Sequence, residues 1–410
     1  MKYFRLNFFC IYLDGFCGGC IYNTNTGDMI RVKKENNDVL KTAQANEPVE
    51  SDNEFLQELV SEGLGAFYDN PVYVECTRVG GDARIQNMME PKTLVHKLFV
   101  QVTNDCGGGC VWCDNSDRII TKTRCKKWNN KEKIITSEKW YGLLGELKNL
   151  GLAVICFIGG DPLMNLSGME KIIIEAKKRG VERFVVYTNL GHLTPEEKDF
   201  INKYDIIVNL EVVNGPDSVG EYTNVVYKDV LANATILKKN NRVVIGNILM
   251  SRYNEKELDR IISDLKAVNV DKIKVDYIYE KPDNDYYSSV YREEMYKKRF
   301  AKITAATLGI YEIYNSCLYG QVSINLSGDV TPCPMMNNCV VGNILESDIV
   351  EILRSKEYRK FVLMSKSKIN KCKDCGFRFN CDDCRAIEYS ATNDVEGQYY
   401  CNYLEQQVDC

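Results

Sequence analysis

The sequence lacks a hydrophobic run long enough to cross a bilayer. Its longest apolar stretches, residues 152–158 and 243–250, have the length of buried strands. Residues 1–12 loosely resemble a signal peptide, but Asn7 interrupts the apolar stretch and no small-residue cleavage site follows it. The sequence therefore predicts a cytoplasmic protein with no membrane segment.

Long basic runs and repeats of fixed period are also missing, and the formal net charge is -5. A nucleic-acid-binding surface usually shows clustered Lys and Arg, so this composition argues against a nucleic-acid partner. The 45% of hydrophobic residues is enough for a sizeable core, and a length of 410 residues predicts two or three domains.

Histidine is scarce and cysteine is abundant, with two histidines against 18 cysteines. In a secreted chain so many cysteines would indicate disulfides. Here the sequence shows no secretory signal, and many cysteines fall into short, uneven clusters. Cytosolic metal ligation is therefore the favoured interpretation. A zinc site normally needs four protein ligands, and the shortage of histidine limits where they can come from.

Residues 91–280 alternate between predicted strands and predicted helices. Six strands are expected, at residues 94–103, 153–160, 183–190, 205–212, 243–250 and 272–280. Repeated β–α units predict parallel strands with helices outside, and six units predict an incomplete α/β barrel. Reactive groups are then expected at the carboxyl ends of the strands. Thr194, Pro195 and Glu197 predict a capping box at the start of one helix.

Smaller regions flank this barrel. Residues 1–90 predict a small α+β domain, with strands at 4–13, 19–23 and 29–32 and a helix at 53–61. Residues 281–315 are typical of a linker with helical character. Residues 316–410 contain nine cysteines and one strong helical stretch, at about 347–364, which predicts a domain held together by metal rather than by a core.

Three cysteines directly follow the first predicted barrel strand. Cys106, Cys110 and Cys113 form a C-x3-C-x2-C pattern. Three thiolates can hold three irons of a [4Fe–4S] cluster and leave the fourth iron open. A zinc knot or unrelated thiols are the alternatives, but the position after the first of six strands favours the cluster. The segment resembles the signature loop of the radical S-adenosylmethionine (radical SAM) superfamily, with Trp112 at the usual aromatic position.

This resemblance implies that the open iron binds S-adenosylmethionine (AdoMet), and that a 5′-deoxyadenosyl radical then removes hydrogen from an unactivated carbon. It also implies AdoMet-binding roles at the ends of later strands. The residues concerned are Gly159, Gly160, Asp161 and Pro162, where Asp161 replaces the usual Glu, then Asn189 after Thr188, Asn209 with Glu211, and Asn247. Strand-ending turns and ordinary polar residues are the alternative interpretation of these positions.

The C-terminal cysteines resemble the SPASM extension of radical SAM maturases. The resemblance implies two auxiliary [4Fe–4S] clusters, one held by Cys372, Cys375, Cys381 and Cys401, and the other by Cys317, Cys333 and Cys384. Two residues, rather than the usual three, separate Cys381 from Cys384. The cluster of Cys317, Cys333 and Cys384 lacks an upstream fourth cysteine, so Cys339 or a substrate thiolate is left for that position. A zinc ribbon is the alternative for residues 372–384.

The remaining cysteines are expected to have no shared site. Cys10, Cys17 and Cys20 lack a clear fourth ligand and are interpreted as small buried residues. Cys76, Cys125, Cys156 and Cys410 are interpreted as single thiols.

The whole arrangement resembles enzymes that mature ribosomally made peptides, in which a small N-terminal domain binds the leader peptide as an added edge strand. The resemblance implies a precursor peptide and a reducing electron donor such as flavodoxin or ferredoxin. Our hypothesis is a thioether cross-link from cysteine, motivated by the missing fourth ligand. The alternatives are carbon–carbon cross-linking or epimerisation, formylglycine formation by a sulfatase-type maturase, and a non-catalytic iron–sulfur peptide-binding protein.

Overall fold

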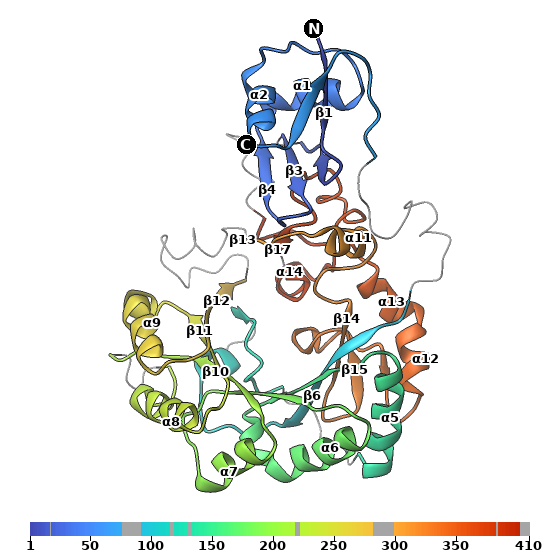
Figure 1. Cartoon of the computed structure of the whole chain (residues 1–410). Helices are drawn as coiled ribbons and strands as arrows, with labels where there is room; N and C mark the ends of the chain where they lie inside the picture. The colour runs from blue at the N-terminus through green and yellow to red at the C-terminus, as the bar shows by residue number, and fades with distance from the viewer. Residues whose placement is uncertain are drawn as a thin grey trace.

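A computed structural model describes residues 1–16, 18–75, 92–114, 119–128, 133, 135–217, 222–281, 299–382 and 384–401. In Figure 1 a small N-terminal domain stands on a larger body that contains the barrel and the C-terminal region. Cys17, Cys76, Cys410 and most of the predicted linker, residues 282–298, lie outside the described residues. None of the described helices has the length and apolar character that crossing a bilayer requires.

The larger body is built on a ten-stranded sheet with the order β16-β15-β14-β6-β8-β9-β10-β11-β12-β7. The six predicted barrel strands lie at its centre, and neighbouring strands are parallel throughout. They are β6 (Val95–Thr103), β8 (Val154–Gly159), β9 (Arg183–Thr188), β10 (Ile207–Val212), β11 (Val244–Met250) and β12 (Lys272–Glu280). The predicted partial six-unit barrel is therefore confirmed.

Helices cover the outer face of these strands (Figure 1). They are α5 (Ser137–Asn149), α6 (Leu166–Lys178), α7 (Pro195–Lys203), α8 (Tyr227–Lys239) and α9 (Leu258–Ala267), with short turns η1 (Pro162–Asn165) and η2 (Glu255–Glu257) before α6 and α9. Outward side chains such as Leu98, Phe157 and Val208 pack against these helices as the main core. The predicted capping box is present at α7, where Thr194 Oγ1 accepts from Glu197 N and Glu197 Oε2 accepts from Thr194 N.

The C-terminal region shares the core of the barrel, which differs from the expectation of a domain held by metal alone. β14 (Gly320–Ile324) pairs parallel with β6, and β15 (Asp329–Thr331) and β16 (Gly342–Asn343) continue the sheet. The open edge of β6 needs a partner for its backbone groups, and β14 supplies it. The other elements are β13 (Arg299–Phe300), α11 (Ala305–Ile313), η3 (Pro334–Met336), α12 (Ile349–Arg354), α13 (Lys356–Val362), β17 (Cys381–Asp382) and α14 (Arg385–Thr392).

The N-terminal domain is α+β, as expected, and has its own apolar core around Phe4, Leu40 and Leu56. Its elements are β1 (Tyr3–Leu6), β2 (Cys10–Leu13), β3 (Gly19–Asn23), β4 (Met29–Val32), α1 (Lys34–Gln44), α2 (Glu54–Ser61) and β5 (Gly65–Tyr68). The single strand predicted at residues 4–13 is wrong. The chain turns at Asn7, whose N–H donates to Leu64 O while its carbonyl accepts from Cys10 N, and this separates β1 from β2.

Candidate active site

The predicted cluster loop follows β6 directly and leads into α4 (Val111–Asp114), which carries Cys113. The Gly108 N–H lies 3.3 Å from Cys106 Sγ. A Cβ atom on Gly108 would lie 3.3 Å from Cys106 Sγ and 3.5 Å from Cys110 Sγ. Both sulfurs therefore border one small space that a side chain at position 108 would fill.

A neighbouring segment, residues 222–224, braces this loop. Asn224 N donates to Gly108 O at 2.7 Å, and Val111 N donates to Tyr222 O at 2.9 Å. Thr223 Oγ1 lies 3.3 Å from Cys110 Sγ and donates to Gly108 O at 2.7 Å. These contacts hold the backbone of the cysteine loop in a defined curve, although nothing in the sequence pattern of residues 222–224 indicated such a role.

The donor set suits a [4Fe–4S] cluster better than a single ion. In such a cluster each thiolate binds a different iron, so the ligand sulfurs surround a space instead of meeting at a point. Among the residues that the structure describes, no three Cys, His, Asp or Glu side chains converge closely enough to hold one ion. Cys106 and Cys110 instead flank the space beside Gly108.

The Gly159–Gly160–Asp161 segment packs directly on the cysteine loop. A Cβ atom at Gly159 would clash with Thr103 O, and one at Gly160 would clash with Asp105 O. The close approach of two backbones therefore requires both glycines. Asp161 is 2% exposed; its carboxylate accepts from Thr188 Oγ1 at 2.7 Å and from Leu163 N at 3.2 Å. Pro162 starts η1, and burial raises the pKa of the Asp161 carboxyl.

Asn189 joins the cysteine loop to a fourth thiol. Its Nδ2 lies 3.7 Å from Cys106 Sγ and 3.7 Å from Cys125 Sγ. Cys125 Sγ also donates to Gly160 O at 3.2 Å. Cys125, interpreted from the sequence as a single thiol, therefore lies in contact with the cysteine loop. A hydrogen bond with Cys125 lowers the pKa of Cys106 to about 7, which favours the thiolate that iron binding requires.

The other predicted AdoMet-binding residues form a separate network in the barrel interior. Asn209 Nδ2 donates to Glu211 Oε1 at 3.1 Å, and Asn247 Nδ2 donates to Glu211 Oε2 at 2.9 Å. Glu211 is fully buried, which raises its pKa to about 7. Trp112 is also buried, at 1% exposure, and its ring packs 5.9 Å from that of Tyr222.

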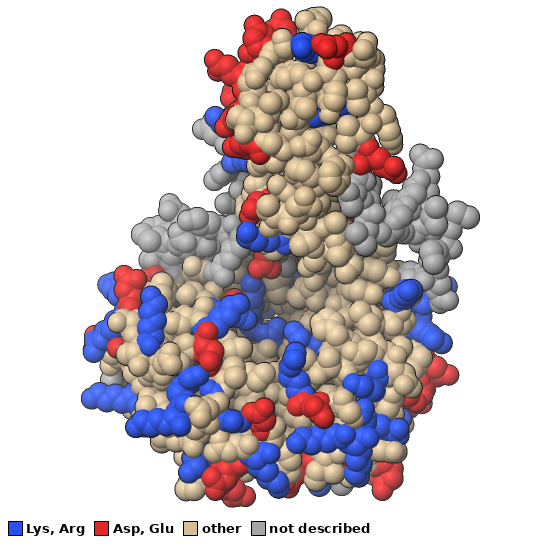
Figure 2. All heavy atoms as spheres, viewed as in Figure 1, with Lys and Arg blue, Asp and Glu red and all other residues tan. Residues whose placement is uncertain are grey.

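A basic segment crosses the barrel above these residues. β7 (Ile119–Thr121) pairs antiparallel with β12, and Lys126 N donates to Gly159 O at the end of β8. Between these two points, the Arg124 guanidinium lies 5.0 Å from the Phe99 ring and 5.2 Å from the Tyr187 ring. Figure 2 shows a hollow between the barrel and the N-terminal domain with basic side chains inside it. Sequence reasoning missed this segment, although Lys and Arg alternate at positions 122, 124 and 126.

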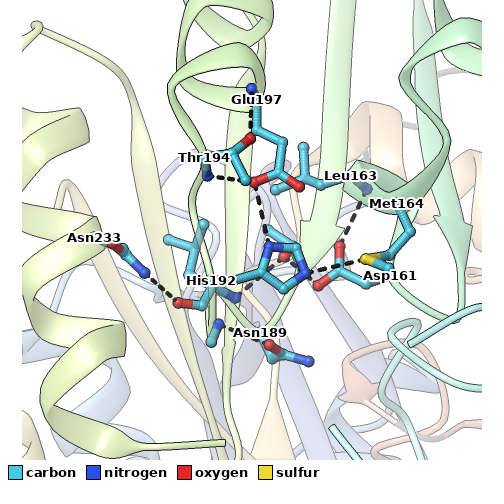
Figure 3. A network of polar contacts seen from close by, with 11 residues as sticks. Asp161, Leu163, Met164, Asn189, His192, Thr194, Glu197 and Asn233 are labelled. Carbon is cyan, nitrogen blue, oxygen red and sulfur yellow. Dashed lines mark hydrogen bonds and ion pairs between the residues drawn. The ribbon is translucent and has the colours of Figure 1, made fainter. Parts of the chain in front are cut away.

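A polar network lies at the end of β9, beside Asp161 and Asn189 (Figure 3). His192 Nδ1 lies 3.2 Å from Glu197 Oε2, and His192 Nε2 lies 3.1 Å from Met164 Sδ. Asn233 Nδ2 donates to Leu190 O at 3.0 Å and so fixes the turn from α8. The hydrogen bond to Glu197 raises the pKa of His192. Burial would raise the pKa of Glu197, but the bonds from His192 and Thr194 lower it.

These opposite shifts predict a pH-dependent contribution to stability. The His192–Glu197 pair contributes fully between the ordinary pKa values of Glu and His, about 4.3 and 6.5. The contribution is lost as pH rises through the raised pKa of His192, because the imidazole loses its charge. Glu197→Gln should therefore destabilise the protein at pH 6 more than at pH 9. We expect a difference of about 0.5 kcal/mol, since His192 is more than one-third exposed.

Anaerobic denaturant titrations at pH 6 and pH 9 measure this difference directly. Lys203 and Glu170 form an ion pair at 2.8 Å on the same helical layer, away from His192. The Tyr204 hydroxyl also donates to Glu170. Glu170→Gln is the matched control, because the pKa values of Lys203 and Tyr204 are both raised above their usual range, so neither partner titrates between pH 6 and pH 9. An equal loss of unfolding free energy at both pH values for Glu197→Gln would contradict the assigned pair.

The C-terminal cysteines fall into two groups. Cys333, Cys339 and Cys384 pack within one cluster of side chains that also includes Leu318, next to Cys317 in the chain. In the second group, the Cys375 N–H donates to Cys372 O at 3.0 Å. Burial, together with the nearby thiolates of Cys381 and Cys401, raises the pKa of Cys375 to about 11. Cys339 thus packs with Cys333 and Cys384, and Cys375 lies near Cys381 and Cys401, while the assignment of these cysteines to two clusters stays a prediction.

Two family models match this chain. Residues 100–265 match the model of the radical SAM superfamily, and residues 316–376 match the model of the SPASM iron–sulfur cluster-binding domain. The protein is a radical SAM enzyme. Its radical SAM domain implies a [4Fe–4S] cluster and AdoMet as cofactors, and its SPASM domain supports auxiliary iron–sulfur clusters.

Solved structures share the fold of this radical SAM enzyme. SuiB from Streptococcus suis, bound to its precursor peptide SuiA, superposes with a TM-score of 0.55 at 15% identity and covers 98% of this chain and 100% of its own. The enzyme anSMEcpe with bound AdoMet has a TM-score of 0.57 at 15% identity and covers 76% of this chain and 94% of its own. An uncharacterised protein of Methanocaldococcus jannaschii is 23% identical over 281 residues, 63% of this chain and 92% of its own length.

Proposed function

We propose that this radical SAM enzyme modifies a ribosomally made precursor peptide and forms thioether cross-links from its cysteines. The observation that carries the proposal is the likeness to SuiB over the full chain, N-terminal domain included, in a structure where SuiB holds its precursor peptide. The likeness to anSMEcpe covers only 76% of this chain. The N-terminal domain is therefore the part that bears most on the choice of substrate.

The N-terminal domain offers strand edges to a peptide. In its three-stranded sheet β3 lies in the middle, so β2 and β4 are the outer strands. An extended leader peptide that pairs with such an edge satisfies backbone groups that would otherwise rely on water. We propose that this pairing recruits the precursor peptide. The core segment of the peptide would then reach the barrel mouth, which is the open end of the barrel at the carboxyl ends of its strands.

The residues of the barrel prepare the site for radical chemistry. When bound, the cluster and AdoMet supply a 5′-deoxyadenosyl radical that removes a hydrogen atom from carbon. Cys106, Cys110 and Cys113 would hold the cluster, and Asn189 and Thr223 orient two of those sulfurs. The segment 122–126 lies across the barrel and limits the access of water to the reacting groups. A reducing protein such as flavodoxin or ferredoxin would supply the electron.

The thioether proposal depends on an iron that is left open for a substrate thiolate. Cys317, Cys333 and Cys384 would supply three ligands. Cys339 packs beside Cys333 and Cys384, and it is therefore the protein residue that competes with a substrate thiolate for the fourth position. If a substrate thiolate takes that position, Cys339→Ala should retain cross-linking, because Cys339 is then no ligand.

Product mass tests the proposed reaction. We expect reduced enzyme, AdoMet and a cysteine-containing precursor peptide encoded next to this chain to give a product that lacks two hydrogens per cross-link. The same product should have lost one alkylatable cysteine for each cross-link, because the sulfur becomes a thioether. Epimerisation would leave the mass unchanged, and carbon–carbon cross-linking would leave every cysteine free to alkylate. Formylglycine formation would remove the sulfur altogether.

A further inference from the structure

The N-terminal domain rests on a loop that connects two of the auxiliary-cluster cysteines. We call residues 376–380, between Cys375 and Cys381, the platform loop. The Tyr22 hydroxyl on β3 donates to Gly376 O at 2.8 Å, and the Tyr22 hydroxyl oxygen also lies 3.2 Å from Asn380 Oδ1. Just before the loop, Asp374 O accepts from the Phe16 N–H at 3.0 Å. Both ends of the platform loop therefore contact the N-terminal domain.

Two glycines allow these backbones to touch. A Cβ atom on Gly15 would clash with the backbone nitrogen of Gly376. A Cβ atom on Gly376 would lie only 3.2 Å from the backbone nitrogen of Cys20. No side chain separates the two segments at this point, so a small displacement of the platform loop is passed directly to the turn between β2 and β3.

An apolar cluster surrounds this backbone contact. Cys20 and Tyr22 point to the same side of β3, and both are fully buried. They pack with Ile11 of β2 and with Phe377 and Phe379 of the platform loop. Met29 on β4 adds a polar contact, because Asn380 Nδ2 lies 2.7 Å from its Sδ. One face of the N-terminal sheet thus has the platform loop as its core partner.

The platform loop has little regular structure of its own. The Cys375 N–H and the Cys381 N–H close single turns, to Cys372 O and Phe377 O respectively. β17, which follows, is only two residues long and pairs with the two residues of β13. Arg378 also donates to Cys375 O, through its backbone N–H and its Nη1, and Ala301 N donates to Asn380 O at 2.7 Å. The platform loop is therefore a series of turns with no helix or strand of its own, and both flanking positions carry a cysteine that the SPASM resemblance assigns to one cluster.

We infer that Cys375 and Cys381 anchor the N-terminal domain: by binding the auxiliary cluster they fix the platform loop, and the loop fixes the domain. Cys375 and Cys381 therefore help to position the N-terminal domain, in addition to any part that their cluster has in electron transfer. On the proposed function, the same anchor sets where the precursor peptide enters. Because linkage is reciprocal, displacement of the domain should also disturb the platform loop.

Hydrogen exchange of the full-length, anaerobically reconstituted protein tests the anchor without any peptide. In Cys381→Ala, peptides that contain Phe16 and Tyr22 should exchange about tenfold faster or more than in the unmodified protein, since their partner surface becomes mobile. Peptides from β8 and β9 should be unchanged. Cys333→Ala removes a cysteine of the other auxiliary set and should leave the exchange at Phe16 and Tyr22 unchanged.

A second variant covers the case in which Cys381→Ala fails to fold. Tyr22→Phe keeps every cysteine and removes only the hydroxyl that contacts Gly376 and Asn380. It should retain full iron content and still show faster exchange in the platform loop and at Phe16. The inference is overturned if either Cys381→Ala or Tyr22→Phe exchanges like the unmodified protein in these segments, or if Cys333→Ala loosens them equally. If these exchange experiments disprove the anchor, the product-mass test of the peptide reaction still stands, because it measures the product and not the position of the N-terminal domain.

Discussion

Cys106→Ala is expected to reduce the formation of 5′-deoxyadenosine from AdoMet by about 10³-fold or more, to the background of the assay. The cluster can then draw on only two of the three loop thiolates, Cys110 and Cys113. The Cys106 sulfur also contacts Asn189 and the Gly108 backbone, so its loss removes a predicted ligand that its neighbours hold in place. The measurement is 5′-deoxyadenosine released under strong reductant, followed by chromatography.

A matched control separates loss of the ligand from loss of packing. Cys156 is buried in the same barrel, on β8, and its side chain packs with Phe99 and Ile158. Cys156→Ala should keep AdoMet cleavage, because this thiol has no place in the cluster loop. Mössbauer or EPR spectra of both variants should show the radical-loop cluster in Cys156→Ala alone. Normal cleavage by Cys106→Ala would remove the basis of the enzyme assignment.

Cys372→Ala is expected to lower the iron content by about one third, the share of one [4Fe–4S] cluster among three. Thermal stability should fall with it, because cluster binding is coupled to folding of the segment that supplies the ligands. Cys372 lies within a small apolar cluster with Met364 and Ile369, and the turn from Cys372 to Cys375 starts the approach to the platform loop. Iron analysis and calorimetry of anaerobically reconstituted protein measure both effects.

Cys10→Ala is the control for Cys372→Ala. Cys10 is a buried cysteine of the N-terminal domain, at the start of β2, and belongs to neither cysteine set. Its replacement should reduce stability modestly through lost packing but leave the iron content whole. A full complement of iron in Cys372→Ala would show that this cysteine is not a ligand, and the second auxiliary set would then need another member.

The order of the barrel strands was predictable because each strand has its own local sequence pattern. Six apolar runs of strand length, separated by helical stretches, leave few topologies other than a parallel sheet with outer helices. The strand at residues 4–13 failed for a tertiary reason. Apolar residues lie on both sides of Asn7, but the chain turns at Asn7 to reach Leu64, a residue that no local pattern connects to it.

The residues of the candidate site likewise divide into those that a local sequence pattern predicts and those that it does not. The radical-loop cysteines, Asp161 and Glu211 could be predicted as site residues because a short motif or a strand end marks each of them. Cys125, Arg124 and the brace at residues 222–224 were not, because each acts through residues that are distant in the chain. Cys125 reaches the site only when its segment crosses from β12 to the end of β8.

The sequence by itself determined the chemistry of this protein. The thiolate spacing suits iron–sulfur clusters, and a barrel carries these thiolates. Both features depend on patterns among residues that are close together in the chain. Only the tertiary structure decided which thiols share a space, what covers the barrel mouth, and where the N-terminal domain stands. The physical reason is that these outcomes depend on contacts such as that between Tyr22 and Gly376, separated by 354 residues, which form only when the whole chain has packed.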